Sequence, residues 1–322
     1  ETMVMRFFSG TRSQGLLGIR STSKRKVRPL LCLDKKEILL YAKKHQVPYR
    51  VDETNTETHY LRNFLRHEIL ARLESKIKNL GKRLDTTHHH IRQEHHLLDF
   101  FSHHYLVQHA YWKKNMLIFS TKGLPHSDAT VALLCFLLNI NANQAKQVLL
   151  SEKKQVHSYP NWRLTFYDDK IWIQKSRDSK PLKEALSIQT LPFEIQIPGG
   201  TLTAAEVSHF DFTPDANIEF IPLRSKNPRL TICRWKQGDK IEIKAGHHKK
   251  VSDVLNEKKL SPMEKENIFC LWNETKLLWV IGVRLSLEAY ARPSDTHFMK
   301  LRYTPYPTRN PTMKDIQNFF LR

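Results

Sequence analysis

The hydrophobic pattern of the first residues predicts a short helix. Met3, Phe7 and Phe8 lie near one face of a helical repeat, and the pattern breaks at Ser9-Gly10. No capping residue precedes this run, and the first residue is Glu1 rather than methionine. We therefore expect that the chain starts inside a helix and that an upstream segment is missing.

A capping signal predicts the next helix. Asp34, followed three residues later by Glu37, has the form of a capping box and predicts a helix over residues 35–45. Residues 47–51 then form a short extended stretch, and another helix should begin near Tyr60. Because a strand that follows a helix favours a parallel sheet, we expect this region to be the end of an α/β unit.

The rest of the chain divides by pattern into three parts. Helical periodicity over 74–111 and 131–150 gives way to short strands, which predicts a mostly helical middle domain at residues 76–220. Residues 221–295 are expected to form a small α+β domain. Residues 296–322 are expected to be a basic tail.

The net charge of the chain indicates what kind of partner it binds. The 322 residues contain 52 Lys and Arg against 32 Asp and Glu, a formal net charge of +20. Such a field attracts polyanions, and nucleic acid is the first candidate. Charge alone would equally suit a basic ribosome- or DNA-associated protein of unrelated origin.

The cysteine spacing and the lengths of the apolar runs indicate the cellular compartment. The four cysteines are far apart in sequence and form no C-x-x-C pair, which favours a reducing cytoplasm over a disulfide-rich or zinc-ribbon protein. No apolar run approaches the roughly 20 residues that span a bilayer, and no export signal is visible. We expect a cytoplasmic protein without a membrane partner.

One polar segment carries the strongest chemical signal. Asp52 and Asn55 follow the predicted strand, at the end of a sheet where ligands bind in α/β folds. Arg62 and Arg66 are four residues apart and share a helix face, with Asn63 beside them. A carboxylate, an amide and two guanidiniums could together bind a base edge, a phosphate and an ammonium group. The alternative is an ordinary polar loop next to an exposed basic helix face.

These motifs, in this order, resemble tRNA(Ile)-lysidine synthetases. Asp-x-x-Asn followed by Arg-Asn-x-x-Arg-His is similar to a motif of that family. Further similar stretches cover the region before residue 70 and the region between 230 and 285: Glu1–Arg6, Gly15–Ile19, Arg28–Leu31, Arg234–Lys240, Lys249–Leu255 and Trp279–Arg284.

The resemblance implies a fold and an activity. It implies the end of a nucleotide α-hydrolase-like, PP-loop ATPase domain at residues 1–75, a middle tRNA-binding domain, and a lysidine-synthetase-type C-terminal domain. Enzymes of this family use ATP, with Mg²⁺, to activate C2 of the wobble cytidine of tRNA(Ile), and L-lysine then displaces AMP. The product, lysidine, changes codon and amino-acid specificity.

The ATP-binding loop of the family is not found in this sequence. Its Ser-Gly-Gly-x-Asp-Ser motif has no counterpart, since Ser9-Gly10 lacks the second glycine and Gly199-Gly200 lies far downstream. The chain is therefore expected to lack the PP-loop segment and to have no ligase activity alone. Two hypotheses stay open: a ligase whose catalytic domain ends here, or an N-terminally truncated tRNA-binding remnant without chemistry.

The resemblance also assigns candidate site residues. It identifies no catalytic residue, metal ligand or ATP ligand in this sequence. A homodimer is also possible. The substrate pocket for cytidine and lysine would be lined by Asp52, Asn55, Arg62, Asn63 and Arg66. The candidate tRNA-binding residues are Lys24, Arg25, Lys26, Arg234, Lys236, Lys249 and Lys250.

A histidine-rich stretch invites a metal hypothesis that its spacing does not favour. Seven histidines fall between His88 and His104, but no pair inside the cluster is four residues apart, the spacing of a helical zinc pair. We interpret the stretch as a solvated helix face.

Overall fold

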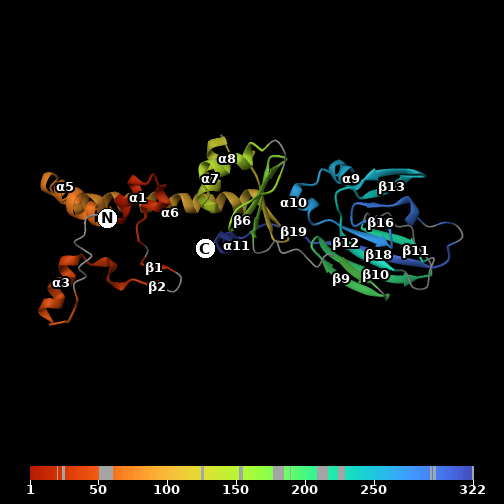
Figure 1. Cartoon of the computed structure of the whole chain (residues 1–322), viewed down its shortest axis with the longest axis horizontal. Helices are drawn as coiled ribbons and strands as arrows, with labels where there is room; N and C mark the ends of the chain where they lie inside the picture. The colour runs from red at the N-terminus through yellow and green to blue at the C-terminus, as the bar shows by residue number, and fades with distance from the viewer. Residues whose placement is uncertain are drawn as a thin grey trace. The chain divides into compact units, whose positions relative to one another are not determined.

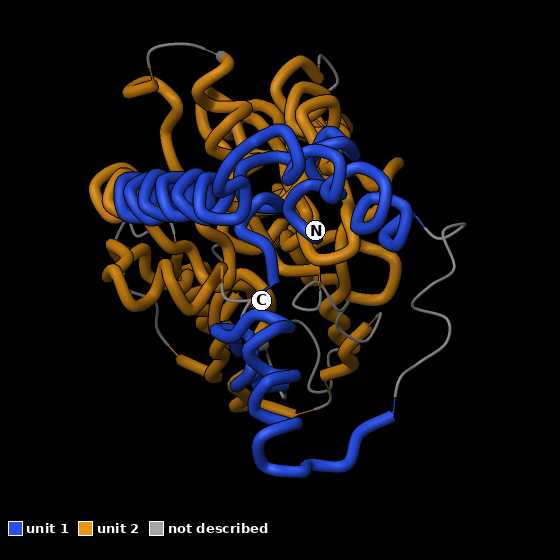
Figure 2. Tube along the Cα trace, turned by 90° about the vertical axis from the view of Figure 1, so that its left-hand side faces the viewer, with its two compact units in different colours: residues 1–102 blue, residues 103–322 orange. Residues whose placement is uncertain are grey.

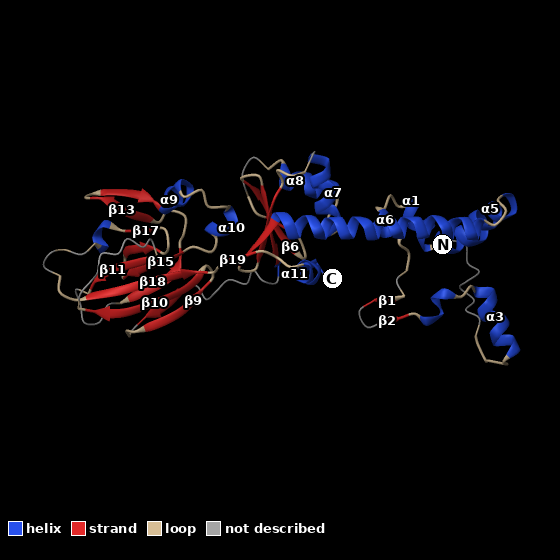
Figure 3. Cartoon of the chain, turned by 180° about the vertical axis from the view of Figure 1, so that it is seen from behind, coloured by secondary structure: helices blue, strands red, loops and turns tan. Residues whose placement is uncertain are grey.

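The chain divides into two compact units, residues 1–102 and 103–322 (Figure 2). The computed structural model describes residues 1–19, 21–23, 26–50, 61–124, 127–151, 155–176, 185–188, 190–208, 217–223, 229–290, 292 and 295–320. Among these residues, no helix is both long enough and apolar enough to cross a membrane. The strands are concentrated in the second unit, whereas the first is largely helical (Figure 3).

Unit 1 consists of short helices, most of the long helix α6 and one two-stranded antiparallel pair (Figure 1). The last helix, α6, continues into unit 2. The elements are α1 Thr2–Phe8, α2 Ser13–Leu16, β1 Thr22–Ser23, β2 Lys26–Val27, a 3₁₀ turn Pro29–Cys32, α3 Lys35–Lys44, α4 Leu61–Phe64, a π-helical turn Leu65–Leu70, α5 Ala71–Lys76 and α6 Leu80–His109.

The local signals in unit 1 are confirmed. Helix α1 ends at Phe8, and Gly10 adopts a φ of 68°, a left-handed conformation that glycine accepts readily. The capping box is present: Glu37 N donates to Asp34 Oδ1 and Asp34 N to Glu37 Oε2, each at 2.8 Å. Each bond satisfies a backbone donor at the start of a helix or just before it, so α3 begins where the sequence predicts.

The predicted strand at residues 47–51 is wrong for its described part. Residues 47–50 form neither helix nor strand, and Val51 is outside the described residues. The Val47 amide donates to the Ala42 carbonyl at 2.9 Å, so it closes the end of α3 instead of pairing with a neighbouring strand. The only strands among the described residues of unit 1 are β1 and β2, which are antiparallel.

The first half of unit 2 is an antiparallel six-stranded sheet, in the order β19-β3-β4-β7-β6-β5, with helices on one face. The middle region is therefore less helical than predicted, because β3 and β4 follow α6 directly. Its elements are β3 Ala110–Lys113, β4 Met116–Ser120, α7 Ser127–Leu138, α8 Ala142–Leu149, β5 His157–Ser158, β6 Trp162–Tyr167, β7 Lys170–Lys175, β19 Thr308–Arg309 and α11 Met313–Phe320.

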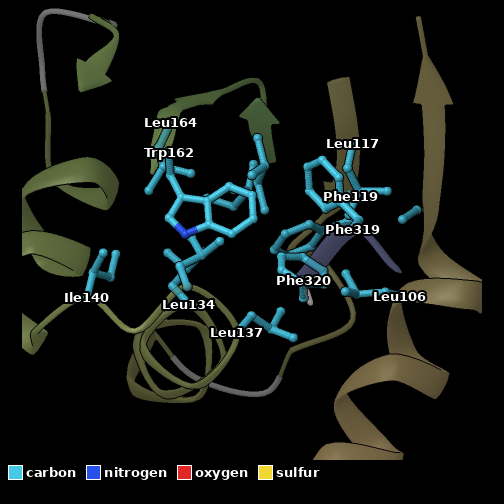
Figure 4. Packing of buried hydrophobic residues seen from close by; sticks show 14 of the residues in the cluster. Leu106, Leu117, Phe119, Leu134, Leu137, Ile140, Trp162, Leu164, Phe319 and Phe320 are labelled. Carbon is cyan, nitrogen blue, oxygen red and sulfur yellow. The ribbon is translucent and has the colours of Figure 1, made fainter. Parts of the chain in front are cut away.

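Helix α11 completes the core of this half (Figure 4). The Phe319 ring lies 4.8 Å from Trp112 and 5.3 Å from Trp162, measured between centroids. Phe320 also contacts Trp162 and is 8% exposed. The prediction of a basic tail at residues 296–322 is therefore wrong, because the segment forms β18, β19 and α11 and its buried residues include Phe298, Met299, Leu301, Ile316, Phe319 and Phe320.

The second half of unit 2 has two antiparallel sheets, in the orders β11-β18-β10-β9 and β17-β16-β15-β12-β8, and a separate hairpin β13-β14. Its elements are β8 Ala185–Ile188, β9 Phe193–Ile197, β10 Gly200–Val207, β11 Ile218–Pro222, β12 Leu230–Arg234, β13 Lys240–Lys244, β14 His247–Lys250, α9 Val251–Glu257, α10 Pro262–Lys265, β15 Phe269–Asn273, β16 Lys276–Val280, β17 Arg284–Leu285, a 3₁₀ turn Leu287–Ala289 and β18 Phe298–Pro305.

A single core joins the two sheets of this half. Leu202 of β10, Ile232 of β12 and Leu301 of β18 belong to one buried cluster. On the opposite face of the five-stranded sheet, Cys270 packs with Ile241 of the hairpin and with residues of α9. The predicted boundary between residues 220 and 221 falls inside the first of these cores, because β8 to β11 already belong to it.

Contacts in unit 2 connect its two halves. Met263 of α10 is 1% exposed and packs with Met116, Ile118 and Trp172 on the second face of the six-stranded sheet. Glu264 forms an ion pair with Lys113, and Glu266 pairs with Arg163 at 2.6 Å. An apolar contact surrounded by ion pairs fixes the junction between the two halves.

Candidate nucleic-acid interface

Two of the predicted substrate residues meet on one carboxylate. Arg66 donates from Nε to Glu1 Oε1 at 2.6 Å and from Nη2 to Glu1 Oε2 at 2.9 Å. Arg62 donates from Nε to Glu1 Oε2 at 3.1 Å. The two arginines project from successive turns of α4 and the π-helical turn that follows it. Two cations on one anion leave a net positive charge, held in a fixed geometry by a bidentate guanidinium.

The arginines set the protonation of this carboxylate. Hydrogen bonds from Arg66 and Arg62 lower the pKa of Glu1 from 4.5 to about 2, although partial burial opposes the shift. The same interaction raises the pKa of Arg66. The cluster is thus fully charged at any pH near neutrality.

A pH prediction follows from the lowered pKa of Glu1. A depressed carboxyl pKa stabilises the fold above the unfolded value of 4.5, and this contribution is lost as the pH falls from 4.5 to about 2. We expect Glu1→Gln to reduce the stability of unit 1 by roughly 1 kcal/mol at pH 7, since the cluster is partly exposed. Thermal unfolding of the variant and the parent protein should converge near pH 2. A difference that does not depend on pH would contradict this linkage.

Of the other predicted pocket residues, the structure describes only Asn63. It is 8% exposed, whereas the side chains of Arg62 and Arg66 are 51% and 29% exposed. Asp52 and Asn55 lie outside the described residues. Of the basic loop, Lys24 and Arg25 are also outside them, while Lys26 is exposed in β2.

Among the described basic residues of the C-terminal half, some form ion pairs and others do not. Lys249 forms an ion pair with Glu257. Lys250 is exposed and lies directly across the hairpin from Lys240, which is exposed as well. Like charges opposite one another destabilise an antiparallel pair by roughly 0.2–1 kcal/mol, so this arrangement suits a surface that meets a polyanion.

Sequence reasoning missed Lys240 and Lys244 on this surface. Lys240-Ile241-Glu242-Ile243-Lys244 alternates polar and apolar positions, and Ile241 is fully buried while both lysines are exposed. The alternation alone would have placed the two lysines on the solvent face of a strand. Lys236 is exposed beside this hairpin in sequence, and its backbone amide donates to Asp239 Oδ2 at 2.6 Å.

The opposed lysines lead to a salt-dependence prediction. Lys250→Gln is expected to weaken RNA binding and to reduce the slope of log affinity against log salt by about 0.7–0.9, the value of one phosphate contact. Lys249→Gln should change the slope less, because Glu257 already neutralises Lys249. Anisotropy titrations of labelled tRNA at several salt concentrations measure both slopes. Equal slopes for the two variants would contradict the distinction.

Neither glycine motif of the chain has the geometry of a phosphate cradle. The Gly10 amide donates to Phe7 O at 3.0 Å and the Ser9 amide to Met5 O at 3.1 Å, so both close the end of α1. Gly200 starts β10 and pairs with Ile197 and Pro305. A cradle needs free amides at the start of a helix, and these amides are at a helix end or in a sheet.

Metal ligands are likewise not assembled in the described residues. Across them, no group of three or more His, Cys, Asp or Glu side chains could hold a metal ion. In the histidine-rich helix α6, His88 Nε2 lies 3.0 Å from the Leu17 carbonyl oxygen, which connects α6 to the turn after α2.

Two family models match the chain, one at each end. A PP-loop domain model matches residues 1–73, and a TilS substrate C-terminal domain model matches residues 230–301. The first match contradicts the expectation that the chain lacks the PP-loop segment: sequence of that domain is present. It also supports an α/β nucleotide-hydrolase-like class for this region.

Curated relatives align over most of the chain. The tRNA(Ile)-lysidine synthase of Parabacteroides distasonis is 25% identical, covering 88% of this chain and 66% of the relative. That of Bacillus subtilis is 26% identical, covering 89% and 66%. That of Treponema denticola is 43% identical over 70 residues, 22% of this chain and 15% of the relative. The chain thus spans just under two thirds of the length of the first two relatives.

Among solved structures, one titled "Crystal structure of TILS C-terminal domain" matches with a TM-score of 0.34 and 19% identity, covering 38% of this chain and 98% of that one. The two family models and the aligned relatives support a relationship of this chain to the tRNA(Ile)-lysidine synthase family.

Proposed function

We propose that this chain is part of a tRNA(Ile)-lysidine synthase, a ligase that uses ATP to join L-lysine to C2 of the wobble cytidine of tRNA(Ile). One observation carries the proposal. The PP-loop model and the TilS C-terminal model match in order at residues 1–73 and 230–301, and lysidine synthases align across both. Such a ligase changes the codon and amino-acid specificity of its tRNA.

In this proposal the arginine cluster of unit 1 meets the substrate. Arg62 and Arg66 are held by Glu1 in a fixed geometry, so they can bind a phosphate without first being ordered. Asp52 would hold the lysine ammonium or orient the base, and Asn55 would read the base edge. Asn63, which is buried, would support the helix that carries the two arginines.

The basic surface of unit 2 would bind tRNA phosphates. Lys240, Lys244 and Lys250 of the β13–β14 hairpin supply exposed cations, and Lys236 adds another. Lys24, Arg25 and Lys26 add further cations. We expect these residues together to bind RNA phosphates, in keeping with the net charge of +20. The protein would work in the cytoplasm, and a homodimer remains an open expectation.

The described residues do not fit ATP or Mg²⁺. The Ser9 and Gly10 amides close a helix end, Gly199 and Gly200 lie at a hairpin, and among the described residues no acidic cluster is placed to hold a metal. ATP is part of the proposed reaction only because this chain is related to the lysidine synthases. The described residues supply no step that acts on ATP.

This misfit favours a second candidate function, a tRNA-binding module without ligase activity. It would use the same basic surfaces and would form no bond. The two candidates differ in one measurable property, the incorporation of lysine into RNA.

The test is to incubate tRNA(Ile) with this 322-residue chain, ATP and radioactive lysine, beside a version extended upstream in frame. Saturable tRNA binding with lysine incorporation by the extended version alone would support the ligase and place the nucleotide site outside this chain. Binding without incorporation by either version would favour the binding module. Failure of both versions to bind tRNA would overturn both candidates.

A further inference from the structure

Arg234 lies at the edge of the core between the two sheets, with no anionic partner among the residues that the structure describes. Its guanidinium carbon is 5.8 Å from the centroid of the Phe269 ring, its partner across β12 and β15. Phe269 is 2% exposed, so this contact is on the apolar side of the sheet. The Nε of Arg234 is buried, with no hydrogen-bond acceptor in the part of the chain that the structure describes. A buried guanidinium donor without an acceptor carries a desolvation cost.

Lys114 brings a second positive charge toward the same place. It occupies the turn between β3 and β4 with a φ of 57°, and the residue as a whole is exposed although its ammonium is partly buried. Its ammonium donates to the Pro198 carbonyl at 2.6 Å and lies 5.1 Å from the centroid of Tyr306. Burial of the ammonium and the nearby charge of Arg234 both lower the pKa of Lys114. The neighbours of both cations contact α10: Lys113 pairs with Glu264, and Trp235 Nε1 donates to the Lys265 carbonyl at 2.7 Å, so both cations lie at the same junction.

The carboxylates at this junction are occupied elsewhere. Glu264 forms an ion pair with Lys113 and accepts from the Ser261 hydroxyl and amide at 2.9 Å. Glu266 pairs with Arg163. Within the described residues, neither Lys114 nor Arg234 forms an ion pair with a carboxylate. Among the described residues, the two cations at this junction thus have no carboxylate counterion, while their neighbours Lys113 and Arg163 are neutralised.

We propose that Lys114 and Arg234 bind one phosphate group of an RNA backbone, at the junction between the two halves of unit 2. A phosphate placed between them accepts from both cations and supplies them with a counterion. The site takes one residue from each half, so RNA bound there contacts both. That the phosphate belongs to RNA rests on the proposed function. That the site binds a phosphate at all rests only on Lys114 and Arg234.

The site can be tested by measuring the acetylation rate of Lys114 by mass spectrometry, with the full chain free, with saturating tRNA, and with inorganic tripolyphosphate. Both ligands are expected to protect Lys114 several-fold. Lys122, an exposed lysine of unit 2 that contacts Asp169 at 3.6 Å, is the internal control and should stay reactive. Arg234→Gln should abolish the protection of Lys114, and Arg234→Lys should retain part of it.

Affinity supplies a second readout. Lys114→Asn tolerates the left-handed backbone and is expected to weaken tRNA binding roughly ten-fold at moderate salt, whereas Lys122→Asn should not. In the Arg234→Gln background, Lys114→Asn should weaken tRNA binding by a smaller factor, because both residues contact the same phosphate. Unfolding temperatures of all variants identify any that fail to fold.

The outcomes distinguish failure of the phosphate site from failure of the proposed function. Unprotected Lys114 in a chain saturated with tRNA would overturn the site while leaving the proposed function standing. If the chain binds no tRNA, the proposed function fails, and tripolyphosphate then decides the site: protection supports a phosphate site, and unchanged acetylation overturns it.

Discussion

Phe319→Ala is expected to destabilise unit 2 by about 3–5 kcal/mol, the cost of truncating a buried aromatic residue. The ring is 8% exposed and lies against Trp112 and Trp162, so its removal leaves a cavity between helix and sheet. Chemical denaturation followed by tryptophan fluorescence measures the loss.

The matched control for this variant is Phe8→Ala, which removes the same atoms from a side chain that is 69% exposed. It should change stability by no more than about 0.5 kcal/mol. If both variants lost the same small amount, the terminal helix would not be part of the core.

Gly282→Ala is expected to cost about 2–5 kcal/mol, from two separate causes. Gly282 has a φ of 71°, which is unfavourable for alanine by about 1–2 kcal/mol. A Cβ at this position would also lie 2.6 Å from the ring of Tyr303, and such overpacking typically adds about 1–3 kcal/mol. Tyr303 lies opposite Leu202 of β10, and its amide donates to the Asn217 carbonyl at 2.8 Å, so its backbone cannot easily move aside.

Gly246→Ala isolates the first of these causes. Gly246 has nearly the same φ, 72°, but nothing lies within 4 Å of its added Cβ. This variant should therefore lose only the backbone contribution, about 1–2 kcal/mol. Equal losses for the two glycines, measured by thermal unfolding, would show that Tyr303 does not restrict Gly282.

Elements stabilised by contacts a few residues apart could be predicted from the sequence. The Asp34–Glu37 capping box and the end of α1 at Ser9-Gly10 are both present as predicted. The strand at residues 47–51 was predicted from extended-type residues alone, and a strand needs a neighbour that such a pattern does not supply. Its described residues accordingly have no strand conformation.

Basic composition concealed strand β18. The segment Phe298-Met299-Lys300-Leu301-Arg302-Tyr303 contains alternating apolar and basic positions, the pattern of a half-buried strand. It forms β18, which is paired on both sides by β10 and β11. Its lysine and arginine led to the interpretation as a tail, although strands with one solvent-facing side commonly carry charge there.

The candidate sites required contacts that are distant in sequence. Arg62 and Arg66 could be placed on one helix face, but their shared partner Glu1 is more than 60 residues away. Lys114 and Arg234 are separated by 120 residues and carry no motif in common. Spacing rules apply within one helix or strand, so they cannot show which cations lack a counterion.

The return of the chain at β19 and α11 has a consequence for synthesis on the ribosome. Strand β19 pairs with β3, almost 200 residues earlier, and the whole two-sheet half is inserted between these partners. The half that begins first therefore cannot be completed until residue 320 has left the exit tunnel, whereas the inserted half has all its strands by residue 305. We expect the later-starting half to mature first, leaving the apolar face of the earlier sheet open to chaperones until α11 has emerged from the ribosome.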